Sequence, residues 1–110
     1  MARLSIAINE IYLKFLPMAE KVGITLDLDF PDPTIEVEDT ERIKKDLEKS
    51  LKTAVGKRPK STIKITVVRG KIIVTDSETV LSKQMCEFLS VGHIKVKSKV
   101  GFGTTVTIDF

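Results

Sequence analysis

The last nineteen residues of this 110-residue chain, 92–110, restrict its fold more than any other segment. Apolar and polar residues alternate over 94–98 and again over 106–110, which is the period-2 pattern of strands with one buried face. Gly101 and Gly103 supply the turn between them. Strands with one solvated face normally belong to a sheet that helices cover on a single side, so the hairpin predicts such a sheet.

The upstream sequence supplies further strands and the helices. Apolar residues recur at helical spacing from Ile8 to Val22, and Pro17 is expected to kink or divide that helix because proline removes a backbone donor. Asp39 or Thr40 is placed to cap a second helix. The expected elements upstream of the hairpin are a helix over 8–22, a strand over 24–30, an extended piece over 35–37, a helix from 40 to 54 or 55 that Gly56 and Pro59 terminate, strands over 62–68 and 71–75, and a helix over 79–89.

This order of elements predicts an α+β fold. The expected architecture is a two-layer α/β sandwich, with a mixed sheet of about five strands and three helices on one face. The length fits a single domain over 1–110. The expected buried positions on the last two helices are Ile43, Leu47, Leu51 and Ala54, and Val80, Met85, Phe88 and Leu89.

Composition limits the functional classes. The net charge of +3 is too small to demand a polyanionic partner. Cys86 is the single cysteine, so no internal disulfide forms, and no export signal or membrane-spanning apolar run is present. These features predict a cytoplasmic protein without a membrane span. Charged residues make up 30% of the chain beside one Asn and one Gln, which favours a heat-adapted source.

Several short segments, taken in order, carry a family resemblance. The strongest is 92–110, which reads as a glycine, an Ile-x-Val-x-Ser strand and a Gly-x-Gly-Thr turn into a final strand. The upstream anchors are Ala19 with 23–26, then 39–43, then Leu51, Ala54 and Pro59, then 74–76. From about Ile6 to Phe110, this order resembles the ATP-binding catalytic domain of two-component sensor histidine kinases, the Bergerat fold of the GHKL superfamily. The resemblance is broken by one large deletion.

The resemblance implies two residues on the adenine side of a nucleotide site. In the family, an aspartate after the central strand accepts a hydrogen bond from the adenine amino group, and the threonine of the Gly-x-Gly-Thr turn supports that contact. These positions fall on Asp76 and Thr104. A carboxylate at a strand end is also an ordinary turn or cap residue, so both interpretations stay open.

The resemblance also implies a phosphate and metal side, from which this chain departs. The family places two asparagines four residues apart on the second helix, and the later one binds Mg²⁺. Lys49 and Thr53 stand there, and they are the weaker candidates for nucleotide contacts. A threonine hydroxyl can reach a metal, but a lysine is a repelling charge. ATP or ADP therefore remains a candidate ligand, while no metal site is predicted.

The deletion removes the segment that would hold a triphosphate. Residues 77–91 are all that separate Asp76 from the terminal hairpin, so the lid and the second glycine cluster of the family are absent. Glu78 and Val80 stand where the family has two glycines, and these side chains block a close approach of the backbone to phosphate. The chain also lacks the family's phosphoacceptor helical hairpin. His93, its only histidine, is expected to be an exposed strand residue, and Cys86 a buried apolar thiol.

Three functional hypotheses follow. The first is a degenerate histidine-kinase-like domain that acts as a signalling or docking module without kinase activity, with a kinase, a response regulator or a second copy as partner. The second is a minimal adenine-nucleotide binder that uses Asp76 and Thr104. The third is a nucleic-acid-binding module, in which Lys95, Lys97 and Lys99 on one face of a strand form a basic patch with Lys64 on the open face of the sheet. We favour the first, because base-stacking aromatics are missing from the basic face and the phosphate ligands are lost.

Overall fold

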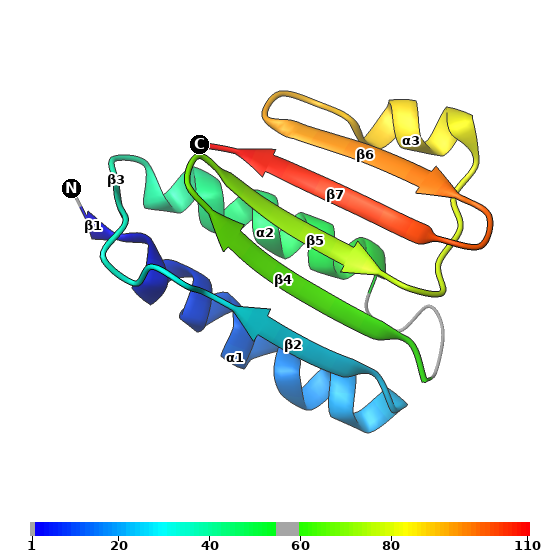
Figure 1. Cartoon of the computed structure of the whole chain (residues 1–110), viewed down its shortest axis with the longest axis horizontal. Helices are drawn as coiled ribbons and strands as arrows, with labels where there is room; N and C mark the ends of the chain where they lie inside the picture. Colours follow the sequence, from blue (N-terminus) through cyan, green and yellow to red (C-terminus); the bar gives the residue numbers. More distant parts are fainter. Residues whose placement is uncertain (1, 55–59) are drawn as a thin grey trace.

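The computed structural model describes residues 2–54 and 60–110. The elements in these ranges are β1 (Ala2–Arg3), α1 (Leu4–Val22), β2 (Thr25–Asp29), β3 (Glu36–Val37), α2 (Thr40–Ala54), β4 (Thr62–Val68), β5 (Lys71–Asp76), α3 (Lys83–Leu89), β6 (Ile94–Lys99) and β7 (Gly103–Asp109). The main sheet has the order β2-β4-β5-β7-β6, in which β2 and β4 are parallel and the other neighbours are antiparallel. The short strands β1 and β3 pair separately near the N-terminus (Figure 1).

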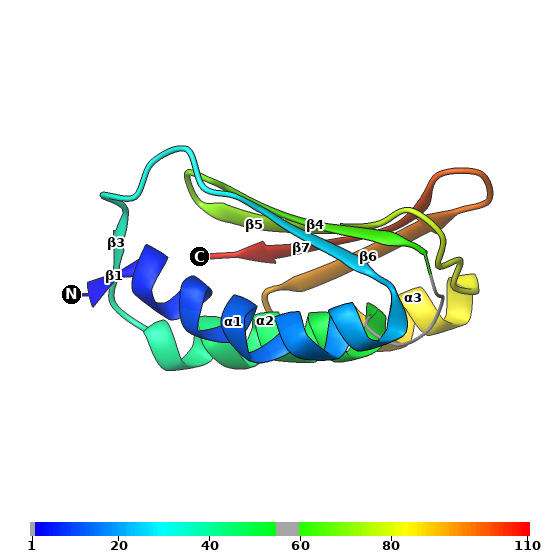
Figure 2. The same ribbon diagram turned by 90° about the horizontal axis from the view of Figure 1, so that it is seen from below.

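The elements form two layers. Figure 2 shows α1, α2 and α3 below the sheet, whose other face is left open. Alternation along the strands produces this arrangement, because the inward residues of β4, and those of β5 before Asp76, are apolar and buried, while the outward ones except Val68 are polar or half-buried. The predicted α+β sandwich, with a mixed five-stranded sheet and helices on one face, is confirmed for the described residues.

The first helix differs from the expectation at Pro17. α1 runs from Leu4 through Pro17 to Val22 without interruption and ends at Gly23, whose φ of 79° is left-handed. Pro17 and Leu13 are both exposed, so the Leu13 carbonyl that lacks a partner faces water, and the helix tolerates the missing donor. The expected break at Pro17 is therefore wrong.

The second helix agrees with the sequence. Asp39 caps it, since its carboxylate accepts a hydrogen bond from the Arg42 amide at 3.0 Å. Ile43, Leu47 and Leu51 are buried, as expected. The expected termination at Gly56 and Pro59, and the side chains of Ala54 and Val55, lie outside what the structure describes.

The third helix is shorter and more exposed than the sequence predicts. It begins after Ser82, so 79–82 belong to the preceding loop. Val80, Met85 and Phe88 are exposed, while Leu89 is half-buried, so three of the expected burials are wrong. The reason is position. α3 lies beside β6, the edge strand, where the Ser90 hydroxyl accepts a hydrogen bond from the Val96 amide at 2.9 Å. α3 therefore covers the sheet edge at β6, and none of its residues is fully buried in the core.

Candidate functional site

Asp76 and Thr104, the residues expected on the adenine side, lie opposite each other on neighbouring strands. Asp76 ends β5 and Thr104 is the second residue of β7, and the two are register partners in the antiparallel pair. Both face the helix layer, and only 3% of Asp76 and 5% of Thr104 are exposed. The sheet therefore brings the two predicted residues together.

The Asp76 carboxylate is bonded to the loop that follows it. One oxygen accepts hydrogen bonds from the Glu78 amide at 3.0 Å and the Thr79 amide at 3.2 Å, and the other accepts from the Thr79 hydroxyl at 2.6 Å. Thr79 is itself buried. Both carboxylate oxygens are thus used within the chain, in the manner of a side chain that caps a turn.

Thr104 is bonded to the same loop. Its hydroxyl donates to the Thr79 carbonyl at 2.7 Å and lies 2.9 Å from the Ser98 hydroxyl. The Ser98 hydroxyl in turn accepts from the Leu81 amide at 2.8 Å. The result is one network that fastens residues 77–82, hereafter the short loop, across the ends of β5, β6 and β7. Among the described residues, no buried side-chain nitrogen or oxygen lacks a partner.

Gly103 lets the short loop lie this close to the sheet. Its φ is +84°, and a Cβ at this position would overlap the Asp76 carbonyl oxygen and lie 2.9 Å from the Ser77 carbonyl carbon and oxygen. Only glycine allows both the left-handed conformation and the contact. The glycine of the Gly-x-Gly-Thr turn therefore fixes the loop as well as the hairpin.

The space between Asp76, Thr104 and α2 is nearly filled. The cavity there has a volume of about 10 Å³. This is about the smallest space that holds one water, whereas ligand pockets span roughly 300 to 1,000 Å³. Its lining residues are Ser50, Thr53, Val74, Asp76, Thr79, Leu81, Thr104 and Val106.

A larger groove lies outside the short loop. It has a volume of about 720 Å³ and separates α2 from the loop and α3; its lining residues are Lys45, Glu48, Lys49, Lys52, Thr53, Thr79, Val80, Leu81, Met85 and Leu89. Lys49 and Thr53 thus border the groove, where the Thr53 hydroxyl donates back to the Lys49 carbonyl at 3.0 Å. Asp76 does not line it. Within residues 2–54 and 60–110, no cluster of three or more His, Cys, Asp or Glu side chains could hold a metal ion.

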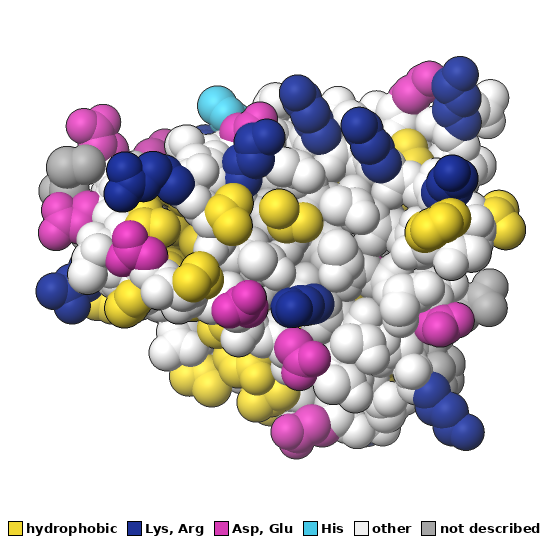
Figure 3. All heavy atoms as spheres, viewed as in Figure 1, with side chains coloured by type: hydrophobic (Ala, Val, Ile, Leu, Met, Phe, Trp, Pro, Cys, Tyr) yellow, Lys and Arg dark blue, Asp and Glu magenta, His cyan; other side chains and the backbone are white. Residues whose placement is uncertain are grey.

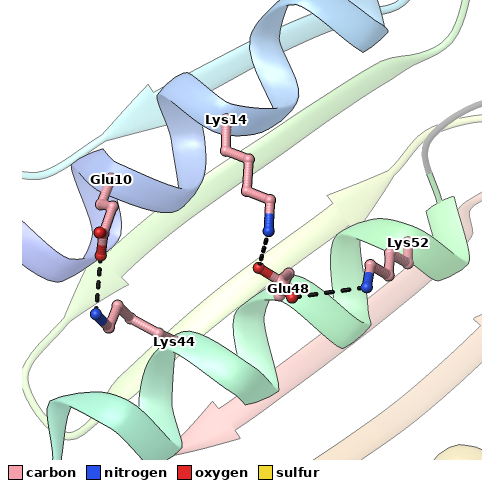
Figure 4. Close-up of polar contacts among 5 residues, drawn as sticks. All are labelled: Glu10, Lys14, Lys44, Glu48 and Lys52. Atoms are coloured by element: carbon pink, nitrogen blue, oxygen red, sulfur yellow. Dashed lines mark hydrogen bonds and ion pairs between the residues drawn. The ribbon is translucent and has the colours of Figure 1, made fainter.

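Ion pairs join α1 to α2, and one of their members, Glu48, lines the groove. Figure 4 shows Lys14 reaching across to Glu48 at 2.6 Å, with Lys52 on the other Glu48 oxygen at 3.6 Å. The hydrogen bond from Lys14 holds the pKa of the Glu48 carboxyl below its usual range. A second pair joins Lys44 to Glu10 at 2.9 Å, and this contact raises the pKa of Lys44.

The remaining candidates lie elsewhere. His93 is exposed, as expected, but it lies in the turn immediately before β6 and not in the strand itself. Cys86 is half-buried against the core, so the expectation of a buried thiol is only partly met. Lys95, Lys97 and Lys99 share the open face of β6, as the period of two predicts.

Sequence reasoning missed Thr79 and Ser98 as members of the site. A threonine three residues after an aspartate is the spacing at which the carboxylate caps a backbone turn, so the Asp76–Thr79 contact had a detectable signal. The Ser98 contact had none, because its partner at Leu81 is distant in sequence and the hairpin register decides the pairing.

Comparison with known proteins gives a result at the level of structure alone. No protein-family model matches the sequence, and no curated protein matches it. The catalytic domain of histidine kinase ThkA, in a nucleotide-free form, superposes with a TM-score of 0.75 at 19% identity, covering 97% of this chain and 93% of that one. The chain has the histidine-kinase catalytic-domain fold.

Other solved structures share this histidine-kinase catalytic-domain fold. Histidine kinase AdeS of Acinetobacter baumannii aligns with a TM-score of 0.73 at 16% identity, over 98% of this chain and 65% of that one. The blue-light-activated histidine kinase of Erythrobacter litoralis gives 0.71 at 18% identity, over 98% and 60%. None of the helices in the described ranges has the length and apolarity to cross a membrane.

Proposed function

We propose that this chain is a degenerate histidine-kinase-like ATP-binding domain that works as a docking module of a two-component-type signalling system, without kinase activity. The observation that carries the proposal is the Asp76 carboxylate, which is 3% exposed and has both oxygens bonded to the short loop. The Thr79 hydroxyl donates where an adenine amino group would have to donate. A nucleotide would have to displace a buried, fully bonded threonine from a charged acceptor.

The phosphate side supports the same conclusion. Catalysis of phosphoryl transfer depends on positioning and on charge stabilisation by backbone donors, cations and metal. Glu78, at one of the expected glycine positions, places a carboxylate on the short loop. Lys49 and Thr53 stand at the expected metal positions, and the Thr53 hydroxyl already donates a hydrogen bond to the Lys49 carbonyl of its own helix. No residue pair at these positions would hold Mg²⁺ and a γ-phosphate together.

The groove between α2 and α3 is the surface we propose for docking a partner. Val80 and Met85 are exposed on one side of it, and Lys45, Lys49 and Lys52 border the other. Exposed apolar side chains beside a charged rim are typical of protein interaction sites. ThkA has been solved in complex with the response regulator TrrA, at a TM-score of 0.75 to this chain over 40% of that kinase chain. By analogy, a response regulator or a kinase is the partner class we propose.

Isothermal titration calorimetry with ATP and ADP, each with and without Mg²⁺, tests the absence of nucleotide binding. We expect no saturable heat up to about 1 mM ligand, a concentration that corresponds to a binding free energy of about −4 kcal/mol. The same titration is run on Asp76→Ala. Saturable binding by the parent protein that disappears in this variant would contradict the proposal.

A minimal adenine-nucleotide binder is the second candidate. The groove of about 720 Å³ has the size of a ligand pocket, and its lysines would attract phosphate. In this alternative, Thr79 leaves Asp76 and the short loop opens into the groove. Binding that requires both Asp76 and Lys49 would favour it.

A further inference from the structure

The open face of the sheet separates its charges between its two edges. Figure 3 shows this face, with dark blue side chains along the edge formed by β6 and magenta ones near β2; the area between them is mostly white, with a few yellow side chains and a dark blue one. The exposed lysines of β6 are Lys95, Lys97 and Lys99, and Asp27 and Asp29 are exposed on β2. β2 and β6 are the two edges of the sheet.

The strand register places these charges in two rows that cross the whole sheet. The first row runs from Asp27 on β2 to Lys97 on β6, and the second from Asp29 to Lys95. Residues between the ends of the first row are Lys64, Thr75 and Thr105; those of the second are Thr66, Ile73 and Thr107. Each row therefore begins with an acid at one edge and ends with a base at the other.

We infer that this open face is a self-association surface, on which two copies of the chain pack sheet to sheet about a two-fold axis parallel to β5. β5 is the central strand, so the axis exchanges the two edges and lays the β6 of one copy over the β2 of the other. Lys97 then faces the Asp27 of the second copy, and Lys95 faces its Asp29. Both contacts occur twice.

The centre of the face suits this arrangement. Ile73 and Thr75 lie on the axis and meet their own counterparts, and both are half-buried already. Thr66 and Thr107 are opposite each other across the interface, and Lys64 faces the Thr105 of the second copy beside the Asp27 of its own chain. Sheets pack about 10 Å apart, a distance that a lysine and an aspartate can bridge from opposite sides.

The alternative two-fold axis, perpendicular to the strands, is disfavoured by charge. It lays β6 on β6 and β2 on β2, so that lysines oppose lysines and aspartates oppose aspartates. Like charges at close range suppress such an arrangement. The charge pattern therefore selects one of the two ways in which the face can meet itself.

The size of the face predicts a weak dimer. Strands about 4.8 Å apart with a rise of about 3.3 Å per residue give on the order of 450 Å² of contact per copy, near the lower limit for specific interfaces. We expect a Kd of about 10 to 100 μM, which increases with salt because the ion pairs lie at the rim. This inference names a second copy as a partner but uses the face opposite the docking groove. The nucleotide titration and the experiment below are therefore independent, and either can contradict its own proposal without bearing on the other.

Sedimentation velocity over a concentration series tests the dimer by charge exchange. Asp27→Lys/Asp29→Lys and Lys95→Asp/Lys97→Asp should each be monomeric where the parent protein dimerises. An equimolar mixture of the two variants should form a heterodimer, because every lysine of one then faces an aspartate of the other. Circular dichroism spectra that match the parent protein's establish that the variants fold.

Glu20→Lys/Glu38→Lys is the matched control. It carries the same change in net charge as the aspartate variant, on exposed positions in α1 and just before α2 that lie outside the main sheet, and should dimerise like the parent protein. A parent protein that stays monomeric at about 1 mM, or a variant mixture that does not associate, overturns the inference. So does salt-dependent binding of a DNA oligonucleotide by the parent protein that Lys95→Asp/Lys97→Asp abolishes, if the parent protein is monomeric without DNA, because the lysines of β6 would then serve a polyanion.

Discussion

Replacing Thr79 by valine tests whether the short loop is fastened to Asp76. Valine keeps the shape of the side chain and removes only the hydroxyl. That hydroxyl donates to the buried Asp76 carboxylate at 2.6 Å and accepts no hydrogen bond from the rest of the network. A hydrogen bond to a charged group contributes about 1.5 to 3 kcal/mol, and Asp76 retains two backbone donors, so we expect a loss of about 2 kcal/mol. For a chain of this size the melting temperature should fall by about 8 °C.

The assay is urea unfolding followed by circular dichroism, with thermal unfolding as a second measurement. Thr62→Val is the matched control, since Thr62 is an exposed strand threonine whose hydroxyl has no bond among the described contacts. Its free energy of unfolding should change by no more than about 0.5 kcal/mol. If Thr79→Val changes stability as little as the control does, the Asp76–Thr79 contact is not formed in solution and the adenine side is open. That result would refute the reasoning behind the proposed loss of nucleotide binding.

Three further substitutions test the packing of the fold. Gly103→Ala should cost about 3 kcal/mol or more in urea unfolding, because its Cβ would overlap the backbone of the short loop; Gly70→Ala, with the same φ of +84° but open space around it, should cost only about 1 kcal/mol. Ser90→Ala should lower the free energy of unfolding by about 1 kcal/mol and speed hydrogen exchange of the β6 edge amide it bonds, whereas unchanged exchange would argue against that contact. The pKa of Glu48 is lowered in the folded state, so its stabilisation is complete above the ordinary carboxyl pKa of about 4.3 and is lost as the pH falls through the lower value. Glu48→Gln should therefore be less stable than the parent protein at pH 7 and equally stable at about pH 2, and a difference that persists in acid would contradict the assignment.

The sequence predicted the main elements because their signals are local. Alternation defines β4, β5 and the terminal hairpin, and the cap at Asp39 marks the start of α2. It failed at Pro17 because a proline signal does not record which side of the helix faces water. It failed for the exposed face of α3 because apolar residues at helical spacing do not reveal that the helix covers a sheet edge.

The candidate site was also predictable only in part. Asp76 and Thr104 could be chosen from the sequence through the resemblance, and the register then placed them side by side. What the sequence did not disclose is that Thr79 bonds to both, through its hydroxyl and its carbonyl. A hydrogen bond of this kind depends on how closely the loop approaches β7, which Gly103 permits.

By itself, the sequence determined where most of the strands and helices form, which residues of the strands and of α2 face inward, and that only residues 77–91 separate Asp76 from the terminal hairpin. These properties follow from periodicity and chain length, which are local. Only the tertiary structure decided that groups of the short loop donate hydrogen bonds to both carboxylate oxygens of Asp76. It also decided that Asp27 and Asp29 lie at one edge of the sheet and the lysines of β6 at the other. Both depend on the pairing of strands that are distant in sequence. Register and strand order are fixed only when the whole core packs.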